Sequence, residues 1–282
     1  MSPLCESYLA ADQLDRMEPF YPLHAFVCDR CFLVQVLEYV SPEAIFGEYA
    51  YFSSYSDSWL AHAKSYVTMI TARLGLTPAS RVVELGSNDG YLLQYFMAQG
   101  IPVLGVEPAR NVAAAAIARG VPTVIRMFGR QTARELAAEG HRADLLCCAN
   151  VLAQVTDVND FVEGMRLLLK PGGVATVEFP HLLRLIEDNQ FDTIYHEHFS
   201  YFSFMSAEQI FAAHGLTLFD VEELPTHGGS LRIYARHADD AQYEVGSRVD
   251  ALRLRERASG LNRVERYAIF TEQVHETKRR LL

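Results

Sequence analysis

The sequence predicts an α/β protein with a mostly parallel sheet that ends in an antiparallel hairpin. Short apolar strands alternate with helices between residues 81 and 179, which is the pattern of a parallel sheet covered by helices on both faces. The last two expected strands, 216–224 and 230–236, are separated only by Pro225-Thr-His-Gly-Gly229. A connection this short joins antiparallel neighbours, so the sheet should close with a hairpin.

The individual elements follow from the alternation of apolar runs and turn residues. A helix is expected at 59–76, because its pattern stops at Gly75 and Pro78. Strands are expected at 81–85, 103–106, 123–126, 144–148, 173–179, 216–224 and 230–236, and helices between them at 90–99, 111–119, 131–139, 160–169 and 206–214. Three regions result: an aromatic- and proline-rich module at 1–58, a core at 59–238 and a charged, mostly helical segment at 239–282.

Composition limits the class of protein. The chain has 282 residues, 50% of them hydrophobic, which is enough for one sizeable core and a smaller module. The net charge of −10 argues against a nucleic-acid-coating surface, and neither a membrane-length apolar run nor a signal-peptide pattern is present in the sequence. Five cysteines, two of them adjacent in a strand where they cannot pair, favour a reducing compartment. We therefore expect a cytoplasmic protein without nucleic-acid or membrane partners.

A glycine-containing loop joins the first core strand to the following helix. In Val83-Glu-Leu-Gly-Ser-Asn-Asp-Gly90, Gly86 permits a tight turn and a close approach of a ligand to the backbone. Glu107 ends the second strand, where a carboxylate can bind both hydroxyls of a ribose. Asn88 replaces the second glycine of a dinucleotide loop, and Glu84 would repel phosphates but suits a cationic methionine group. A dinucleotide enzyme and a purely structural turn stay open as alternatives.

Two further features extend this pattern. Leu169-Lys-Pro-Gly-Gly173 precedes the fifth strand, and the fourth strand begins at Asp144 and leads to Asn150. Together with the glycine loop and Glu107, these motifs resemble, in order, those of class I S-adenosylmethionine methyltransferases. The resemblance implies a Rossmann-like fold and S-adenosylmethionine as cofactor, with Met127 over the adenine unless it is an ordinary core methionine. The cofactor-binding residues that it implies are Glu84, Gly86, Ser87, Asn88, Gly90, Glu107, Met127 and Asn150.

Four proton-handling residues stand together after the fifth strand. Tyr195-His-Glu-His198 brings two imidazoles, a carboxylate and a phenol side by side in the sequence. The carboxyl ends of parallel strands carry the ligand site of such sheets. Next to a bound cofactor, these groups are candidates for acid/base catalysis. On an exposed loop they would be ordinary surface polarity, and either histidine can instead be structural.

Longer motifs indicate one group of methyltransferases. Glu178-Phe-Pro-His181, Tyr195-His-Glu-His-Phe-Ser-Tyr-Phe-Ser203 and Thr226-His-Gly-Gly-Ser-Leu-Arg232 resemble the sugar C-methyltransferases of deoxysugar biosynthesis. The match extends through Phe46-Gly-Glu-Tyr-Ala-Tyr-Phe-Ser-Ser-Tyr-Ser56 and covers nearly the whole chain. It implies methylation of carbon 3 or 5 of a nucleoside-diphosphate 4-keto-6-deoxyhexose, usually a thymidine diphosphate (dTDP) sugar. We also expect a monomer.

The chemistry of that family assigns roles to the candidate residues. A carbon beside a ketone needs a base before it can attack a methyl group, and the enolate oxygen needs hydrogen-bond donors. His198 is the expected base, with Glu197 either orienting it or binding a sugar substituent. Tyr195 and Tyr49 are the expected donors, either to the ketone oxygen or to the substituent at carbon 3. The residues expected at the sugar nucleotide are Ser54, His181, His227, Ser230 and Arg232, of which Arg232 is alternatively a strand residue paired with a surface carboxylate.

The chain departs from the family pattern at three places. Gln154 stands where family members commonly have histidine, so acid/base help from that position is not expected. Of the two Cys-x-x-Cys pairs of the family's zinc module, only Cys28 and Cys31 are present, which is half of a tetrahedral zinc site. The chain also stops before the family's second α/β domain, so truncation at both ends is expected. Two alternatives therefore stay open: a small-molecule O- or N-methyltransferase, and a non-catalytic remnant that binds S-adenosylmethionine.

Overall fold

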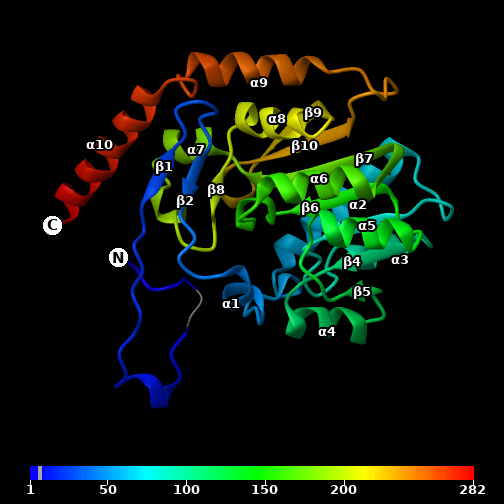
Figure 1. Cartoon of the computed structure of the whole chain (residues 1–282), viewed down its shortest axis with the longest axis horizontal. Helices are drawn as coiled ribbons and strands as arrows, with labels where there is room; N and C mark the ends of the chain where they lie inside the picture. The colour runs from blue at the N-terminus through cyan, green and yellow to red at the C-terminus, as the bar shows by residue number, and fades with distance from the viewer. Residues whose placement is uncertain (6–7) are drawn as a thin grey trace.

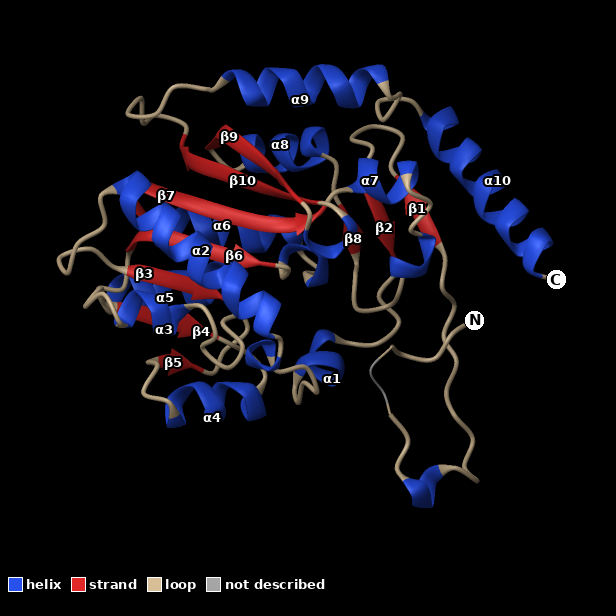
Figure 2. Cartoon of the chain, turned by 180° about the vertical axis from the view of Figure 1, so that it is seen from behind, coloured by secondary structure: helices blue, strands red, loops and turns tan. Residues whose placement is uncertain are grey.

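A seven-stranded sheet forms the centre of the computed structural model, which describes residues 1–5 and 8–282 (Figures 1 and 2). Its strands are β3 (Val82–Leu85), β4 (Val103–Val106), β5 (Thr123–Val124), β6 (Ala143–Ala149), β7 (Leu169–Pro180), β9 (Leu216–Leu224) and β10 (Ser230–His237). The spatial order is β5-β4-β3-β6-β7-β10-β9. Strands β3 to β7 pair in parallel, and β10 pairs antiparallel with β7 and β9. The predicted fold is confirmed.

Helices cover both faces of this sheet, and others flank it (Figure 1). They are α1 (Pro42–Phe46), α2 (Asp57–Leu74), α3 (Leu93–Met97), α4 (Arg110–Ala118), α5 (Arg130–Ala138), α6 (Val158–Leu168), α7 (Leu182–Glu187), α8 (Phe204–Ala213), α9 (Ser247–Ala258) and α10 (Val264–Leu281). The helix expected at 90–99 begins only at Leu93, because Gly90 has a φ of 78° and cannot be part of it. Within the described residues, no helix combines the length and apolar character needed to cross a membrane.

Alternation along the strands creates an apolar core on each face of the sheet. Val83 and Leu85 of β3 pack with residues of α5, α6 and α8, whereas Val82 packs with residues of α2 and α3. A slip of one residue would turn these side chains to the wrong face, so burial fixes the strand register. The loops that follow β3, β4, β6 and β7 consequently meet at one edge of the sheet.

A second sheet, which the sequence did not predict, joins the N-terminal module to the core. It contains β1 (Ala25–Val27), β2 (Val34–Val36) and β8 (Ser200–Tyr201), in the order β1-β2-β8. Val34 of β2 pairs with Tyr201 of β8. Strand β8 begins two residues after the Tyr195–His198 packet. A strand of two residues is too short to show an alternating pattern, and its partner lies far away in the sequence.

Helix α9 is anchored by a buried carboxylate. Glu256 of α9 accepts hydrogen bonds from the backbone N–H groups of Phe204 (2.6 Å) and Met205 (2.9 Å), at the start of α8. An oxygen of Glu256 also lies 2.7 Å from Nε2 of His181, just after β7. Figure 1 shows α9 lying along the β9–β10 end of the sheet, with α10 projecting away from the core. The segment 239–282 is mostly helical, as expected.

Candidate active site

The loop after β3 forms a narrow cradle around Gly86. This residue has a φ of 66°, a left-handed conformation that glycine adopts without steric cost. A Cβ atom at this position would lie 2.3 Å from Cγ2 of Val151, in the loop after β6. Glycine is therefore needed both for the turn and for the close approach of the two loops.

Glu107, directly after β4, organises this loop. Its Oε2 accepts a hydrogen bond from the backbone N–H of Asn88 (2.8 Å), and its Oε1 accepts one from Ala109 (2.8 Å). Burial raises the pKa of the Glu107 carboxyl, although these two hydrogen bonds oppose the shift. Each carboxylate oxygen has a further lone pair, so Glu107 can still accept hydrogen bonds from ligand hydroxyls.

Two polar side chains at or near the ends of strands have buried oxygen atoms. Asn150 has a φ of 58°, and its buried Oδ1 has no hydrogen-bond partner within the described residues. Strained backbone and an unpaired buried oxygen are both uncommon, and together they point to a bound group. Glu84 of β3 is also buried, and burial raises its pKa well above the usual value. A nearby cation would favour its charged form.

The Tyr195–His198 packet forms another wall of the same site. The hydroxyl oxygen of Tyr195 lies 3.0 Å from Nε2 of His198, and their ring centroids are 4.3 Å apart. Burial, with a smaller contribution from the charge of His227, lowers the pKa of His198 to about 4. Glu197 is buried, whereas Nε2 of His196 lies 3.0 Å from the carbonyl oxygen of Pro22 in the N-terminal module.

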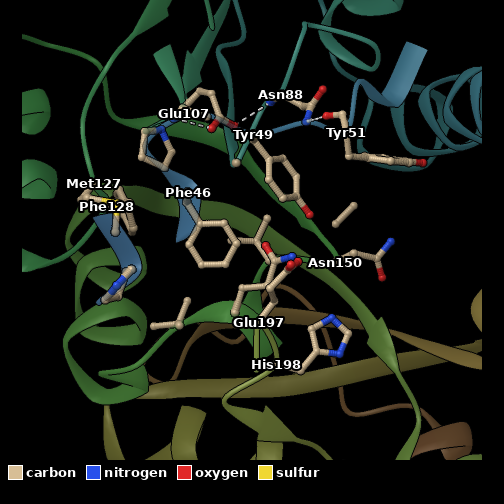
Figure 3. A pocket seen from close by; sticks show the side chains of 18 of the residues that line it. Phe46, Tyr49, Tyr51, Asn88, Glu107, Met127, Phe128, Asn150, Glu197 and His198 are labelled. Atoms are coloured by element: carbon tan, nitrogen blue, oxygen red, sulfur yellow. Dashed lines mark hydrogen bonds between the residues drawn. The ribbon is translucent and has the colours of Figure 1, made fainter. Parts of the chain in front are cut away.

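The N-terminal module supplies the remaining wall. Residues 46–54, which we name the strap, cross the loop that follows β3, and Phe46, Tyr49, Tyr51 and Ser53 line the cavity beneath them. Figure 3 shows the ring of Tyr49 directed into the space between Asn88 and His198. The module therefore contributes directly to the site.

One cavity of about 430 Å³ joins these walls (Figure 3). The predicted site residues that line it are Tyr49, Gly86, Asn88, Glu107, Met127, Asn150, Tyr195, Glu197, His198 and His227. Gln154 lines it as well. The structure thus brings most of the predicted cofactor residues and all of the predicted catalytic residues into a single space.

The wall of this cavity is acidic. It includes the carboxylates of Glu107, Asp157, Asp160 and Glu197, while no lysine or arginine of the described chain lines it. Such a wall favours a cationic ligand.

The other predicted site residues lie behind the walls. They are Ser54, Glu84, Ser87, Gly90, His181, Ser230 and Arg232. Arg232 makes ion pairs with Glu178 (2.8 Å) and Glu222 (3.2 Å), which is the strand-residue alternative rather than a guanidinium open to a phosphate. His181 contacts Glu256, and the Ser230 hydroxyl donates to the carbonyl of Thr226. None of these residues lines the cavity.

Cys28 and Cys31 lie together in the turn between β1 and β2, but they do not form a zinc site. No cluster of three or more cysteine, histidine or acidic residues suited to a metal occurs within the described residues. A structural zinc site takes four ligands, so the residues present do not fit this metal.

Two kinds of site residue were not predicted. The aromatic rings of Trp59 and Tyr91 line the cavity, and the side chain of Asn111 holds the strap. The position of Asn111, in the first turn of the helix after Glu107, was a usable signal. Its partner in the strap is 62 residues away in the sequence, which no local pattern reveals.

Family models match three parts of the chain. A model described as a zinc binding domain matches residues 1–46, and one described as a C-methyltransferase C-terminal domain matches residues 225–282. Between them, a model described as a methyltransferase domain matches residues 59–221, more than half of the chain. The chain belongs to the methyltransferase domain family. The cavity described above lies at the edge of the sheet within this methyltransferase domain, closed by the strap.

Among relatives of this chain, the C-methyltransferase NovU of Streptomyces niveus is 37% identical over 269 residues, which cover 95% of this chain and 64% of NovU. The chain thus spans less than two thirds of that relative's length. A ubiquinone biosynthesis O-methyltransferase of Rhizobium etli is 33% identical over 101 residues, 34% of this chain and 40% of the relative.

Solved structures share the fold. The PH0226 protein of Pyrococcus horikoshii superposes with a TM-score of 0.55 at 14% identity, covering 69% of this chain and 97% of that protein. The 1,6-didemethyltoxoflavin-N1-methyltransferase of Burkholderia thailandensis, solved with S-adenosylhomocysteine, superposes with a TM-score of 0.50 at 20% identity, covering 65% of this chain and 82% of that one.

Proposed function

We propose that this chain transfers a methyl group from S-adenosylmethionine to a ring carbon next to the ketone of a nucleoside-diphosphate 4-keto-6-deoxyhexose. The observation that carries the proposal is the single cavity in which the cofactor loop faces the Tyr195–His198 packet. A carbon acceptor is supported by the C-methyltransferase C-terminal domain match and by the 37% identity to NovU. The resemblance of the motifs to sugar C-methyltransferases supports the sugar nucleotide, with dTDP as the expected nucleotide.

The cofactor supplies an electrophilic methyl group carried on a sulfonium. Glu107 would accept hydrogen bonds from its ribose hydroxyls, and the unpaired Oδ1 of Asn150 would accept one from its amino-acid part. Met127 and Phe128 would cover the adenine. The acidic wall stabilises the positive charge of the bound donor.

Removal of the substrate proton is assigned to His198. With a pKa of about 4, its imidazole is neutral at neutral pH and has one free lone pair. If Nε2–H donates to the Tyr195 oxygen 3.0 Å away, that lone pair is on Nδ1. This tautomer makes Nδ1 the base, with the Tyr195 oxygen as the acceptor for Nε2–H.

The other residues of the site offset the charges that develop. Tyr195 and Tyr49 provide hydrogen bonds to the enolate oxygen, and donors already in place at such an oxygen stabilise the transition state. Glu197 is buried in the same wall and is assigned to orienting His198. Gln154 can hydrogen-bond to the substrate but cannot transfer a proton.

An assay by mass spectrometry tests the proposal. The purified chain is incubated with S-adenosylmethionine and a panel of nucleoside-diphosphate 4-keto-6-deoxyhexoses with either an amino or a hydroxyl group at carbon 3. We expect one methyl group to be added to a ring carbon of at least one sugar. Binding of S-adenosylhomocysteine and a dTDP-sugar without any turnover would contradict the proposed activity and support the non-catalytic alternative.

A further inference from the structure

The strap is attached to the cofactor-binding elements through two asparagine side chains. Oδ1 of Asn111 accepts a hydrogen bond from the backbone N–H of Tyr49 (2.9 Å), and Nδ2 of Asn111 donates to the carbonyl of Tyr49 (2.7 Å). The amide of one side chain thus satisfies both main-chain groups of one residue, as a neighbouring β-strand would.

Asn88 acts in the same way on the next part of the strap. Its Oδ1 accepts from the backbone N–H of Ser53 (3.0 Å), and its Nδ2 donates to the carbonyl of Tyr51 (3.0 Å). Figure 3 shows the contact between Asn88 and Tyr51. Asn88 also lines the cavity, so its replacement would disturb the cofactor directly. A substitution at Asn111 would release the strap without disturbing the cofactor directly, because Asn111 does not line the cavity.

The position of Asn111 is fixed by the packing of its helix against the core. It is the second residue of α4, whose Val112, Ala113 and Ala116 are fully buried against the core. The helix begins three residues after Glu107, and the backbone N–H of Arg110 donates to the carbonyl of Gly47 in the strap. The position of Tyr49 is therefore set by the helix that follows the ribose-binding carboxylate.

We propose that Asn111 is a positioning residue, which fixes the main chain of Tyr49 so that its phenol faces the Tyr195–His198 packet across the cavity. The proposal rests on the proposed function in one respect, the role of Tyr49 as a donor to the substrate oxygen. Asn111 itself touches neither ligand. Its effect on the reaction must then pass through Tyr49.

Hydrogen exchange measures the positioning without any substrate. In the Asn111→Ala variant the amide of Tyr49 loses its acceptor, so its exchange should become at least about tenfold faster than in the wild type. Asn159→Ala is the matched control, because Asn159 is likewise the second residue of its helix, α6, and hydrogen-bonds to His214 on the surface. Asn111→Asp keeps an acceptor for the Tyr49 N–H but places a carboxylate oxygen against the Tyr49 carbonyl, so the exchange rate should lie between those of Asn111→Ala and the wild type. Asn111→Leu, which is close in size and has no acceptor, replaces Asn111→Ala if that variant fails to fold, and it should lose the protection to the same extent.

A double-mutant cycle measures the effect on the reaction. Asn111→Ala should lower kcat by about tenfold to a hundredfold, because small displacements of a catalytic group have effects of this size, while the affinity for S-adenosylhomocysteine stays near that of the wild type. In the Tyr49→Phe background, the same substitution should change kcat by less than about twofold, because the group that it positions is already gone.

Each outcome decides one question. Unchanged exchange at Tyr49 in Asn111→Ala, or additive losses of kcat in the cycle, would overturn the role of Asn111. If the wild-type chain turns over none of the sugar nucleotides, the proposed function fails, while the exchange rates still decide whether Asn111 holds the strap.

Discussion

At the residue scale, the proposed cofactor site depends on the backbone freedom of Gly86. We expect Gly86→Ala to abolish detectable binding of S-adenosylhomocysteine in calorimetry, because the added Cβ would lie 2.3 Å from Val151 in a left-handed backbone. Gly75→Ala is the matched control. Gly75 has a similar φ of 62°, but a Cβ there meets nothing within 4 Å.

The control should lose about 1–2 kcal/mol of folding free energy through left-handed strain and keep its affinity for the cofactor product. Equal affinities in the two glycine variants would contradict the assignment of Gly86 to the cofactor site.

The lowered pKa of His198 predicts how the activity and the stability of the protein depend on pH. The imidazole is neutral in the folded protein down to about pH 4, whereas the ordinary value is 6.5. We expect kcat/KM to stay flat through neutral pH and to fall only as the pH drops toward 4. Between pH 6.5 and 4 the unfolded chain binds a proton that the folded chain does not, so this residue also lowers stability as the pH falls through that range. An acidic limb centred near 6.5 would show that burial does not depress the pKa of this histidine.

At the scale of elements, Glu256 connects α9 to α8 and to the end of β7. Glu256→Ala would leave the N–H groups of Phe204 and Met205 buried without acceptors, as well as Nε2 of His181. We expect it to lower the free energy of unfolding by about 3 kcal/mol, measured by urea denaturation. Glu223→Ala is the comparison, since its half-exposed ion pair with Arg255 should contribute less than about 1 kcal/mol. Similar losses in the two variants would contradict this anchoring role.

Glu178 has a comparable role beside the cavity. Its carboxylate contacts His62 of α2 (3.0 Å) and Arg232 of β10 (2.8 Å), and it accepts a hydrogen bond from the Thr226 hydroxyl (3.0 Å). These contacts fix the loop that presents His227 to the cavity. Glu178 and Arg232 belong to two separate sequence motifs. The register of β7 and β10 places the two residues opposite each other, and only this pairing reveals them as a buried ion pair.

At the scale of the whole molecule, the parts that the sequence predicted are those governed by local periodicity. The alternation of strands and helices in the core correctly predicted the parallel sheet, and the short turn at Pro225–Gly229 correctly predicted its hairpin. Gly86, Glu107 and Asn150 were found because each follows a core strand, and parallel strands end at one edge.

The parts that were missed depend on contacts between distant segments. β8 has two residues and forms only because β2 lies beside it, and the strap is held by Asn111 across 62 residues. His181 was expected at the substrate because it ends β7, but its ring turns toward Glu256 of α9 instead of the cavity. No pattern within either segment encodes such a pairing.

The central claim is that His198 removes the proton next to the substrate ketone. The most direct measurement is the exchange of that hydrogen for deuterium from solvent, followed by mass spectrometry with S-adenosylhomocysteine bound so that no methyl group is transferred. We predict that His198→Asn reduces the exchange rate by at least about a hundredfold relative to the wild type, with unchanged affinity for S-adenosylhomocysteine. Exchange at the wild-type rate in His198→Asn would show that His198 is not the base.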